Sequence, residues 1–249
     1  MEITTHYIVA VTVAFLVAGV IKGAVGQGLP PTAIAISLAF GLPPGEALAL
    51  MTIPTLVSNA WQALDGPHFK AMLARFWPLG APFAVGVIVA AAAAGSLGSG
   101  GSIAWLGLIL AAFAVTALVA WRPRVAKRHE PWANPLCGAV SGAIGGATGI
   151  AAVPFLPYMQ SLELTKDELV QALGILFLFF TGAMTVALWF TGHANTGNMV
   201  NATLATIPTS AGMWLGVRLR RSIPPEAFRK LFLLAMLAFG LYLAKGLWP

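Results

Sequence analysis

Two glycine-rich segments decide the fold: GVIKGAVGQGLPP at residues 19–31 and GAVSGAIGGATGIAAVP at residues 138–154. Three glycines of the first segment recur 119 residues later in the second. Pro31, the last proline of the first segment, corresponds to Pro154 at an offset of 123. Glycine and proline interrupt an apolar sequence at both places, which predicts a broken helix at each. We therefore divide the chain into repeat 1 at 1–121, a basic linker at 122–133 and repeat 2 at 134–249.

The composition is that of a membrane protein. Of the 249 residues, 58% are hydrophobic and 9% are charged, whereas soluble domains carry about 25% charged residues. The mean hydropathy is +0.84. The single cysteine excludes a disulfide scaffold. A net charge of +6 does not indicate a nucleic-acid partner, because the basic residues lie in short connections between apolar segments. The expected surroundings are a lipid bilayer.

The apolar segments predict an all-α polytopic fold. A spanning helix needs about 20 apolar residues. Seven segments meet this length, at about 7–27, 47–64, 76–95, 102–121, 169–191, 198–217 and 228–247. Three apolar pieces at about 31–41, 134–147 and 150–160 are shorter and lie beside the breaks. Each repeat is thus a broken glycine-rich helix pair, which either spans or re-enters, plus three transmembrane helices.

The basic residues predict that the two repeats are inverted. If each broken pair begins and ends on one face of the membrane, the loops at 65–75, 122–130, 161–168 and 218–230 share a side and hold twelve of the fourteen Lys and Arg residues. If each pair crosses once, the loop cations divide seven to six. Positive charge concentrates on the cytoplasmic side, so we expect inverted repeats, a cytoplasmic linker and a multi-pass protein of the cell inner (plasma) membrane.

Breaks at matching positions of inverted repeats indicate a transport site. Half-helices starting near Pro31 and near Gly149–Ile150 would direct positive dipole ends at the centre of the membrane. Such an arrangement binds a small anion. The predicted substrate-binding residues are Lys22, Gly26, Gln27, Gly28, Asn59, Gln62, Gly145, Gly146, Thr148, Gly149 and Thr181.

Two of these assignments have alternatives. Lys22 is the one cation inside a long apolar run, and it either binds the anion or extends to the membrane surface. Glycines spaced by three or four residues either approach a ligand or pack helices together. We favour helix packing for Gly19, Gly23, Gly138 and Gly142, and ligand binding for the glycines at the breaks.

The sequence contains no pattern that indicates an enzyme. The histidines lack metal-ligand spacing, and no phosphate-binding loop or serine nucleophile elbow is present. We therefore expect no metal and no cofactor. Glu46 and Glu168 each open a long helix, where we favour a capping role for the carboxylate over proton relay. The oligomeric state, including a homodimer, stays open.

The motifs resemble those of the TauE/SafE family of sulfite-exporter-like permeases. The pattern G-x3-G-x2-G before a proline occurs twice, and repeat 1 continues with Leu42–Ala47 (LPPGEA) and Pro54–Gln62 (PTLVSNAWQ). The resemblance implies outward movement of sulfite, sulfoacetate or other organosulfonates. The common G-x-G-G-G of the family is replaced here by Gly26-Gln27-Gly28 and by GGATG at 145–149. The resemblance therefore leaves the identity of the substrate open.

Residues and resemblance together predict a secondary transporter or exporter of a small anion. The anion would bind between the two broken helices at mid-membrane, and one repeat would rock against the other. Two alternatives remain: an anion channel, and a membrane subunit that handles sulfur intermediates.

Overall fold

The computed structural model describes residues 5–25, 27–93, 100–119, 124–150, 154–192, 196–219 and 225–245. All regular secondary structure in these residues is helical. This confirms the predicted all-α fold. The helices are α1 (Thr5–Val25), α2 (Leu29–Ala39), α3 (Pro44–Leu64), α4 (Phe69–Ala93), α5 (Gly100–Val119), a short 3-10 turn η1 (Lys127–His129), α6 (Glu130–Thr148), α7 (Phe155–Ser161), α8 (Lys166–Phe190), α9 (Thr196–Leu219) and α10 (Pro225–Ala244).

The seven long helices lie where the sequence predicts them. Within the described chain, three stretches combine the length and the apolar composition needed to cross a membrane: Thr5–Ala24, Phe69–Ala93 and Asp167–Phe190. Helices α3 and α9 have comparable lengths of 21 and 24 residues. Helix α6 is longer than predicted, because the linker residues Glu130 and Pro131 already form its first turn, where proline is well tolerated.

Both predicted breaks are present. The first separates the end of α1 at Val25 from the start of α2 at Leu29, and Gly28 adopts a left-handed φ of 98°. The second follows Gly149, whose φ is 77° and whose N–H donates to Gly145 O at 2.7 Å. The prediction that the second half-helix starts near Gly149–Ile150 is wrong. Helix α7 begins at Phe155, directly after Pro154.

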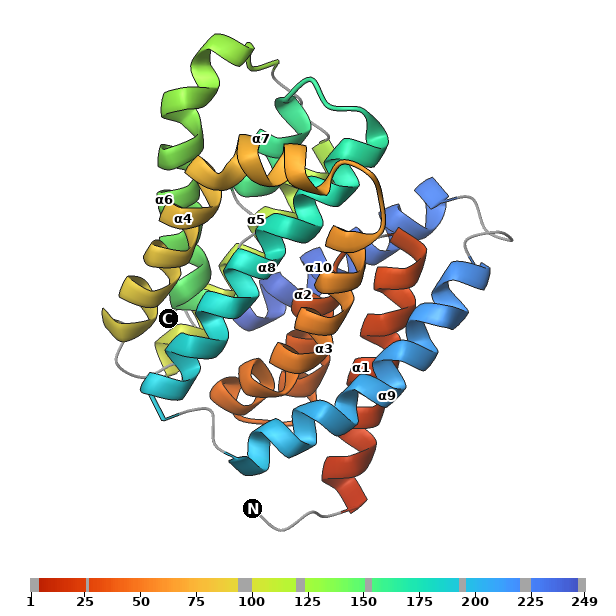
Figure 1. The fold of residues 1–249 in the computed structure, drawn as a ribbon. Coiled ribbons are helices and arrows are strands. Elements are labelled where there is room, and N and C mark those ends of the chain that lie inside the picture. Colours follow the sequence, from red (N-terminus) through yellow and green to blue (C-terminus); the bar gives the residue numbers. More distant parts are fainter. Residues whose placement is uncertain are drawn as a thin grey trace.

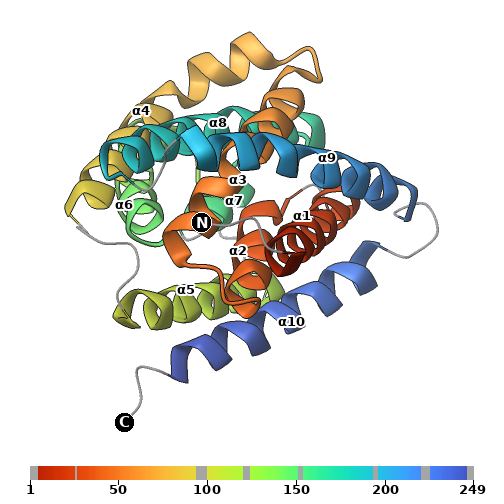
Figure 2. The same cartoon turned by 90° about the horizontal axis from the view of Figure 1, so that it is seen from below.

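The helices form three layers (Figures 1 and 2). In the view of Figure 2, α4, α8, α3 and α9 form one outer layer, and α5 and α10 form the other. The two broken pairs, α1–α2 and α6–α7, lie between them. This arrangement encloses both breaks within protein, where irregular backbone avoids hydrocarbon.

Helix packing links the two halves of the chain in an exchanged pattern. Helix α1 packs on α9, and α6 packs on α4. In the same way α3 packs on α8 and α9, whereas α8 packs on α3 and α4. In Figure 1, α1 and α9 rise from the end where the N terminus lies, whereas α6 and α4 run in the opposite direction. Each broken pair therefore packs against a helix that belongs to the other half of the chain.

Close backbone contacts along glycines form two of these interfaces, which we call the glycine seams. A Cβ atom at Gly19 or Gly23 would overlap the backbone carbonyl oxygen of Thr209 or Met213 on α9. A Cβ atom at Gly138 or Gly142 would overlap that of Leu79 or Phe83 on α4. The glycines correspond at an offset of 119 and their partners at an offset of 130. This confirms helix packing as the role of these four glycines.

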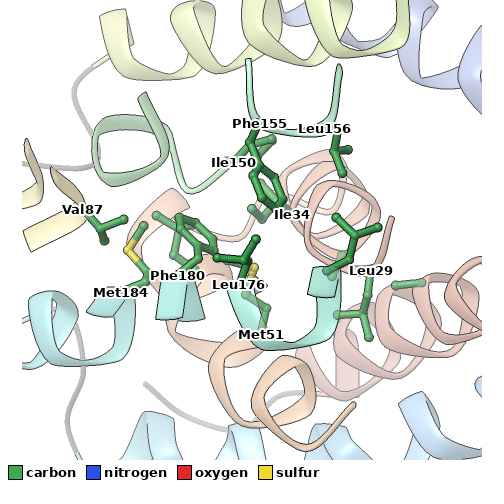
Figure 3. Close-up of a cluster of buried hydrophobic side chains, with 14 of the residues drawn as sticks. Leu29, Ile34, Met51, Val87, Ile150, Phe155, Leu156, Leu176, Phe180 and Met184 are labelled. Carbon is green, nitrogen blue, oxygen red and sulfur yellow. The ribbon is translucent and has the colours of Figure 1, made fainter. Parts of the chain in front are cut away.

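An apolar cluster lies between the breaks (Figure 3). Ile150, Phe155 and Leu156 from the second broken segment point toward Ile34 of α2 and toward α8, which contributes Phe180. The rings of Phe155 and Phe177 form a T-shaped contact, with their centroids 5.3 Å apart. The buried side chains here are apolar, so any charge that approaches them loses part of its hydration and needs polar contacts from the protein.

Candidate functional site

A small cavity lies between the two breaks and next to the apolar cluster. The centre of a water molecule can occupy about 40 Å³ of it. This space accommodates more than one water molecule, since one needs about 10–15 Å³. Its lining consists of Lys22, Gln27, Gly28, Pro30, Pro31, Thr55, Asn59, Gly149, Ile150, Leu156, Phe177, Phe180 and Thr181. Both halves of the chain thus contribute to it.

Lys22 is the charged residue of this lining, in the part of the chain that the structure describes. Its exposed fraction is 6%, so it does not extend to the surface. The Nζ atom donates to Asn59 Oδ1 at 2.6 Å. An ammonium has three donors, so Lys22 has further hydrogen-bonding capacity for a ligand in the cavity.

Asn59 and Thr181 hold Lys22 in place through a chain of hydrogen bonds between the two halves. Asn59 Nδ2 donates to Thr181 Oγ1 at 3.3 Å, and Thr181 Oγ1 donates to Phe177 O at 2.6 Å. The hydroxyl proton of Thr181 is therefore used by its own helix. These contacts orient the Asn59 amide so that its oxygen faces the ammonium. In this conformation the two residues position Lys22, and Asn59 keeps one amide proton for a ligand.

Thr55 is a cavity residue that sequence reasoning missed. Its exposed fraction is 2%, and its Oγ1 atom has no hydrogen-bond partner in the described structure. A buried polar group without a partner costs about 1–3 kcal/mol, so this hydroxyl is available to a bound solute. The signal in the sequence is its spacing, because Thr55 precedes Asn59 by four residues and such residues share one face of a helix.

The backbone at the breaks also borders the cavity, but with fewer donors than predicted. Gly28 and Gly149 both line it in left-handed conformations, which glycine adopts without strain. Pro30 and Pro31 occupy the first turn of α2 and have no N–H. The start of α2 therefore offers its dipole and few amide protons. Most hydrogen-bond donation to a solute would come from side chains.

The structure places six of the predicted site residues at the cavity, namely Lys22, Gln27, Gly28, Asn59, Gly149 and Thr181. Four others lie elsewhere: Gln62, Gly145, Gly146 and Thr148. Gln62 Nε2 donates to Val170 O at 3.0 Å on α8. A Cβ atom at Gly146 would overlap Val87 O of α4, so this glycine extends a seam. Thr148 Oγ1 donates to Ile144 O at 2.7 Å, and Gly145 is buried inside α6. Gly26 lies outside the described residues.

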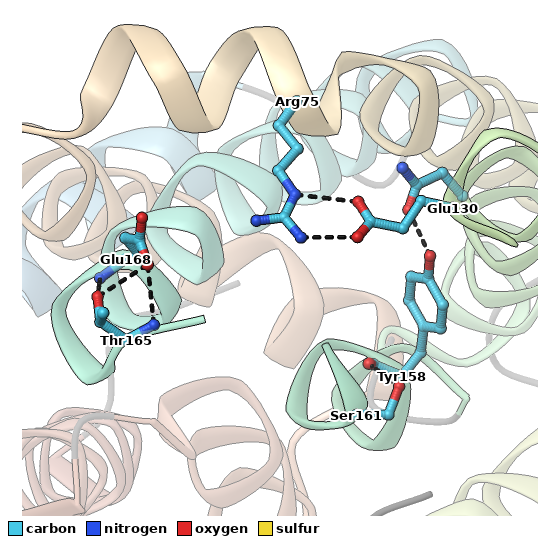
Figure 4. Close-up of polar contacts among 7 residues, drawn as sticks. Arg75, Glu130, Tyr158, Ser161, Thr165 and Glu168 are labelled. Carbon is cyan, nitrogen blue, oxygen red and sulfur yellow. Dashed lines mark hydrogen bonds and ion pairs between the residues drawn. The ribbon is translucent and has the colours of Figure 1, made fainter. Parts of the chain in front are cut away.

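Polar contacts join helices at one end of the molecule (Figure 4). Arg75 of α4 binds Glu130 of α6 with two hydrogen bonds, Nε to Oε2 at 3.0 Å and Nη2 to Oε1 at 2.6 Å. Thr165 and Glu168 form a capping box at the start of α8, which confirms the capping role predicted for Glu168. Gln171 Nε2 donates to Ala63 O and to Gly66 O, both at 2.8 Å, and so closes the α3–α4 turn.

A scan against protein-family models identifies one family, sulfite exporter TauE/SafE, over residues 11–243. No curated protein and no solved structure matches the chain significantly. The family match extends across both halves, both breaks and every described residue of the cavity lining. The chain therefore belongs to the sulfite exporter TauE/SafE family, whose members are membrane transporters of sulfur-related anions and not enzymes.

Proposed function

We propose that this protein exports a small sulfur-containing oxyanion, such as sulfite, sulfoacetate or another organosulfonate, across the inner membrane. The anion occupies the cavity between the two breaks. Lys22 supplies the positive charge, and Thr55 and Asn59 donate hydrogen bonds. The backbone at Gly28 and Gly149 lies close to the anion, because no side chain intervenes there.

The buried position of Lys22 carries this proposal. An isolated charge in an apolar interior is costly unless an opposite charge accompanies it. None of the described lining residues is acidic. Lys22 has an amide oxygen as its partner, which stabilises a cation much less than a carboxylate does. An anionic solute would supply the missing charge, and the unpartnered hydroxyl of Thr55 lies in the same cavity.

The cavity dimensions favour a compact anion. The centre of a water molecule can occupy about 40 Å³ of the cavity, and a space of this size suits a solute of a few heavy atoms. Phe177, Phe180 and Leu156 form the apolar part of the wall. These side chains fit the carbon end of a short sulfonate, whereas its sulfonate oxygens would face Lys22.

The exchanged helix packing supports alternating access. We interpret the two halves as inverted repeats, because equivalent helices run in opposite directions and exchange partners at constant offsets. Each glycine seam joins a broken helix to a helix of the other half, so the moving units in this proposal are the two seams and not the two repeats. Rocking of one unit against the other would open the cavity to alternate sides.

The membrane potential supplies a driving force for export. A negative cell interior favours exit of an anion by about 2.3 kcal/mol per charge per 100 mV. A transporter that moves a net negative charge therefore needs no second ion for export. The described cavity lining, which lacks a carboxylate, is consistent with this uncoupled scheme.

Transport by purified protein in liposomes tests the proposal. We expect saturable uptake or efflux of sulfite or a short sulfonate, faster when the potential drives the anion. Lys22→Met removes the charge at nearly the same length and should abolish flux. Lys70→Met is the matched control, since Lys70 lies exposed on α4, and its flux should equal that of the unsubstituted protein.

Two results would contradict the proposal. Undiminished flux in Lys22→Met would exclude Lys22 as the counter-charge. Flux that rises linearly with anion concentration would identify a channel in place of a transporter.

A further inference from the structure

A second hollow lies outside the central cavity, between α6, α7 and the segment that precedes them. Its volume is about 450 Å³, within the roughly 300–1,000 Å³ range of ligand sites. One end is basic, with Arg124 and His129, and the walls are apolar and aromatic. We call it the α6–α7 groove, and we propose that it binds one anionic phospholipid.

The walls of the groove suit an acyl chain. Trp132, Leu136 and Val140 follow one another at intervals of four on α6, so they form one stripe of that helix. Their exposed fractions are 61%, 57% and 41%, and all three line the groove. In a membrane protein such a stripe faces hydrocarbon, and a concave stripe holds a chain better than a flat surface does.

The rim of the groove suits an anionic headgroup. Arg124 and His129 line it, and Lys127 and Arg128 are exposed in the same turn. Arg128 Nε donates to His129 Nε2 at 3.2 Å, which places a second guanidinium beside the groove. Clusters of basic residues at the cytoplasmic end of membrane helices attract anionic lipids.

Glu130, the acidic residue next to the rim in sequence, does not neutralise it. Glu130 follows His129 directly, but it is buried and both carboxylate oxygens bind Arg75 of α4. Figure 4 shows this pair directed between the helices. Within the residues that the structure describes, the ion pair found is that of Glu130 with Arg75, so Arg124, Lys127 and Arg128 keep their positive charge for a ligand.

The groove is held in shape before any ligand binds. Val125 N donates to Ser161 O at 3.0 Å, which fixes the basic segment to the end of α7. Tyr158 OH donates to Asn134 Oδ1 at 2.6 Å and joins α7 to α6. Because Tyr158 and Pro154 belong to the groove, a lipid there would contact the second broken pair directly. We expect the lipid to stabilise the α6–α7 pair.

Lipid titration of the purified full-length protein tests this site. Native mass spectrometry should detect one tightly bound dioleoylphosphatidylglycerol and weaker binding of dioleoylphosphatidylcholine. Phosphatidylglycerol should also raise the melting temperature more than phosphatidylcholine. Each basic residue near an anionic headgroup contributes about 1 kcal/mol, so Arg124→Gln should weaken phosphatidylglycerol binding roughly five-fold.

Two further variants separate this site from general attraction to the membrane. Arg218→Gln is the matched control, because Arg218 is an exposed arginine at the end of α9, and phosphatidylglycerol affinity should not change. Leu136→Gln places a polar group on the acyl-chain wall and should weaken both lipids by a similar factor. This pattern would support a headgroup rim joined to an acyl-chain wall.

Three outcomes would overturn the proposal. Equal phosphatidylglycerol affinity in Arg124→Gln and Arg218→Gln would remove the basic rim from binding. Equal stabilisation by glycerol 3-phosphate would indicate an anion site without an acyl-chain wall. A dimer that forms without lipid and dissociates in Leu136→Gln would identify a second copy of this chain as the occupant.

Discussion

The two broken pairs have the same scaffold and different chemistry. Helices α1 and α6 both lie against a helix of the other half along a glycine seam. Each is followed by a glycine in the left-handed conformation, Gly28 after α1 and Gly149 after α6. At the offset of 119, however, Lys22 corresponds to Ser141. Lys22 lines the cavity, whereas Ser141 is fully buried near Cys137, with 3.8 Å between its Oγ and the cysteine Sγ. The two halves thus share their packing, whereas the charged residue of the cavity comes from the first half.

The largest expected effect concerns the shared scaffold. Gly23→Ala and Gly142→Ala would each place a methyl group against a backbone carbonyl, on Met213 and on Phe83. Overpacking of this kind costs about 1–3 kcal/mol, so both variants should lower the melting temperature to a similar extent. Gly182→Ala is the control, because beyond the local backbone of α8 an added Cβ there meets no atom of the described residues within 4 Å.

Melting temperatures from thermal unfolding in detergent test this prediction. A strong effect at one seam and none at the other would show that the two halves do not share the scaffold. A Gly182→Ala variant as unstable as the seam variants would show that loss of glycine itself, and not the close contact, is responsible.

A smaller effect distinguishes the second break from an ordinary turn. Gly149 and Gly192 have nearly equal φ angles of 77° and 74°. An added Cβ at Gly149 would overlap Leu48 Cδ2 on α3, whereas one at Gly192 meets no atom within 4 Å among the described residues beyond its chain neighbours. Alanine in this conformation costs about 1–2 kcal/mol, so Gly192→Ala measures the backbone strain alone. Gly149→Ala should lower the melting temperature further, and equal melting temperatures would refute close packing of the second break on α3.

The smallest effect concerns the hydroxyl of Thr55. Thr55→Val keeps the shape and removes a buried group that has no partner in the described structure. The melting temperature without ligand should therefore rise or stay equal, while the affinity for the anion falls about 2- to 10-fold. Thr185→Val is the control, because its hydroxyl donates to Thr181 O at 2.8 Å and it does not line the cavity.

Binding measurements by calorimetry and unfolding measurements by heating give both quantities for Thr55→Val. A lower melting temperature together with unchanged affinity would assign Thr55 a structural role and remove it from the site.

Local patterns in the sequence predict much of the fold. The lengths of the apolar segments predict the seven long helices, and the recurring glycines predict both breaks and close helix packing at Gly19, Gly23, Gly138 and Gly142. The start of α7 could not be predicted, because residues 150–160 are apolar on both sides of Pro154 and periodicity does not locate a helix start there. The start of α6 at Glu130 was missed because a length criterion for apolar residues ignores polar first turns.

The candidate site could be predicted where the signal lies in the residue itself. Lys22 is conspicuous as a cation in an apolar run, and Asn59 and Thr181 occur near equivalent positions of the two repeats. Gln62 and Thr148 are also polar, but tertiary contacts assign them to Val170 O and to the end of α6. Thr55 was missed because a threonine in an apolar helix usually bonds to its own backbone, and sequence does not show that this one lacks a partner.

Anion-dependent melting of Lys22→Met tests most directly whether one half provides the binding charge. In the unsubstituted protein, sulfite or a short sulfonate should raise the melting temperature, since a ligand that binds the native state stabilises it. Lys22→Met should show no rise, whereas Ser141→Ala should respond as the unsubstituted protein does. An equal rise in Lys22→Met, or a rise lost in Ser141→Ala, would contradict the account.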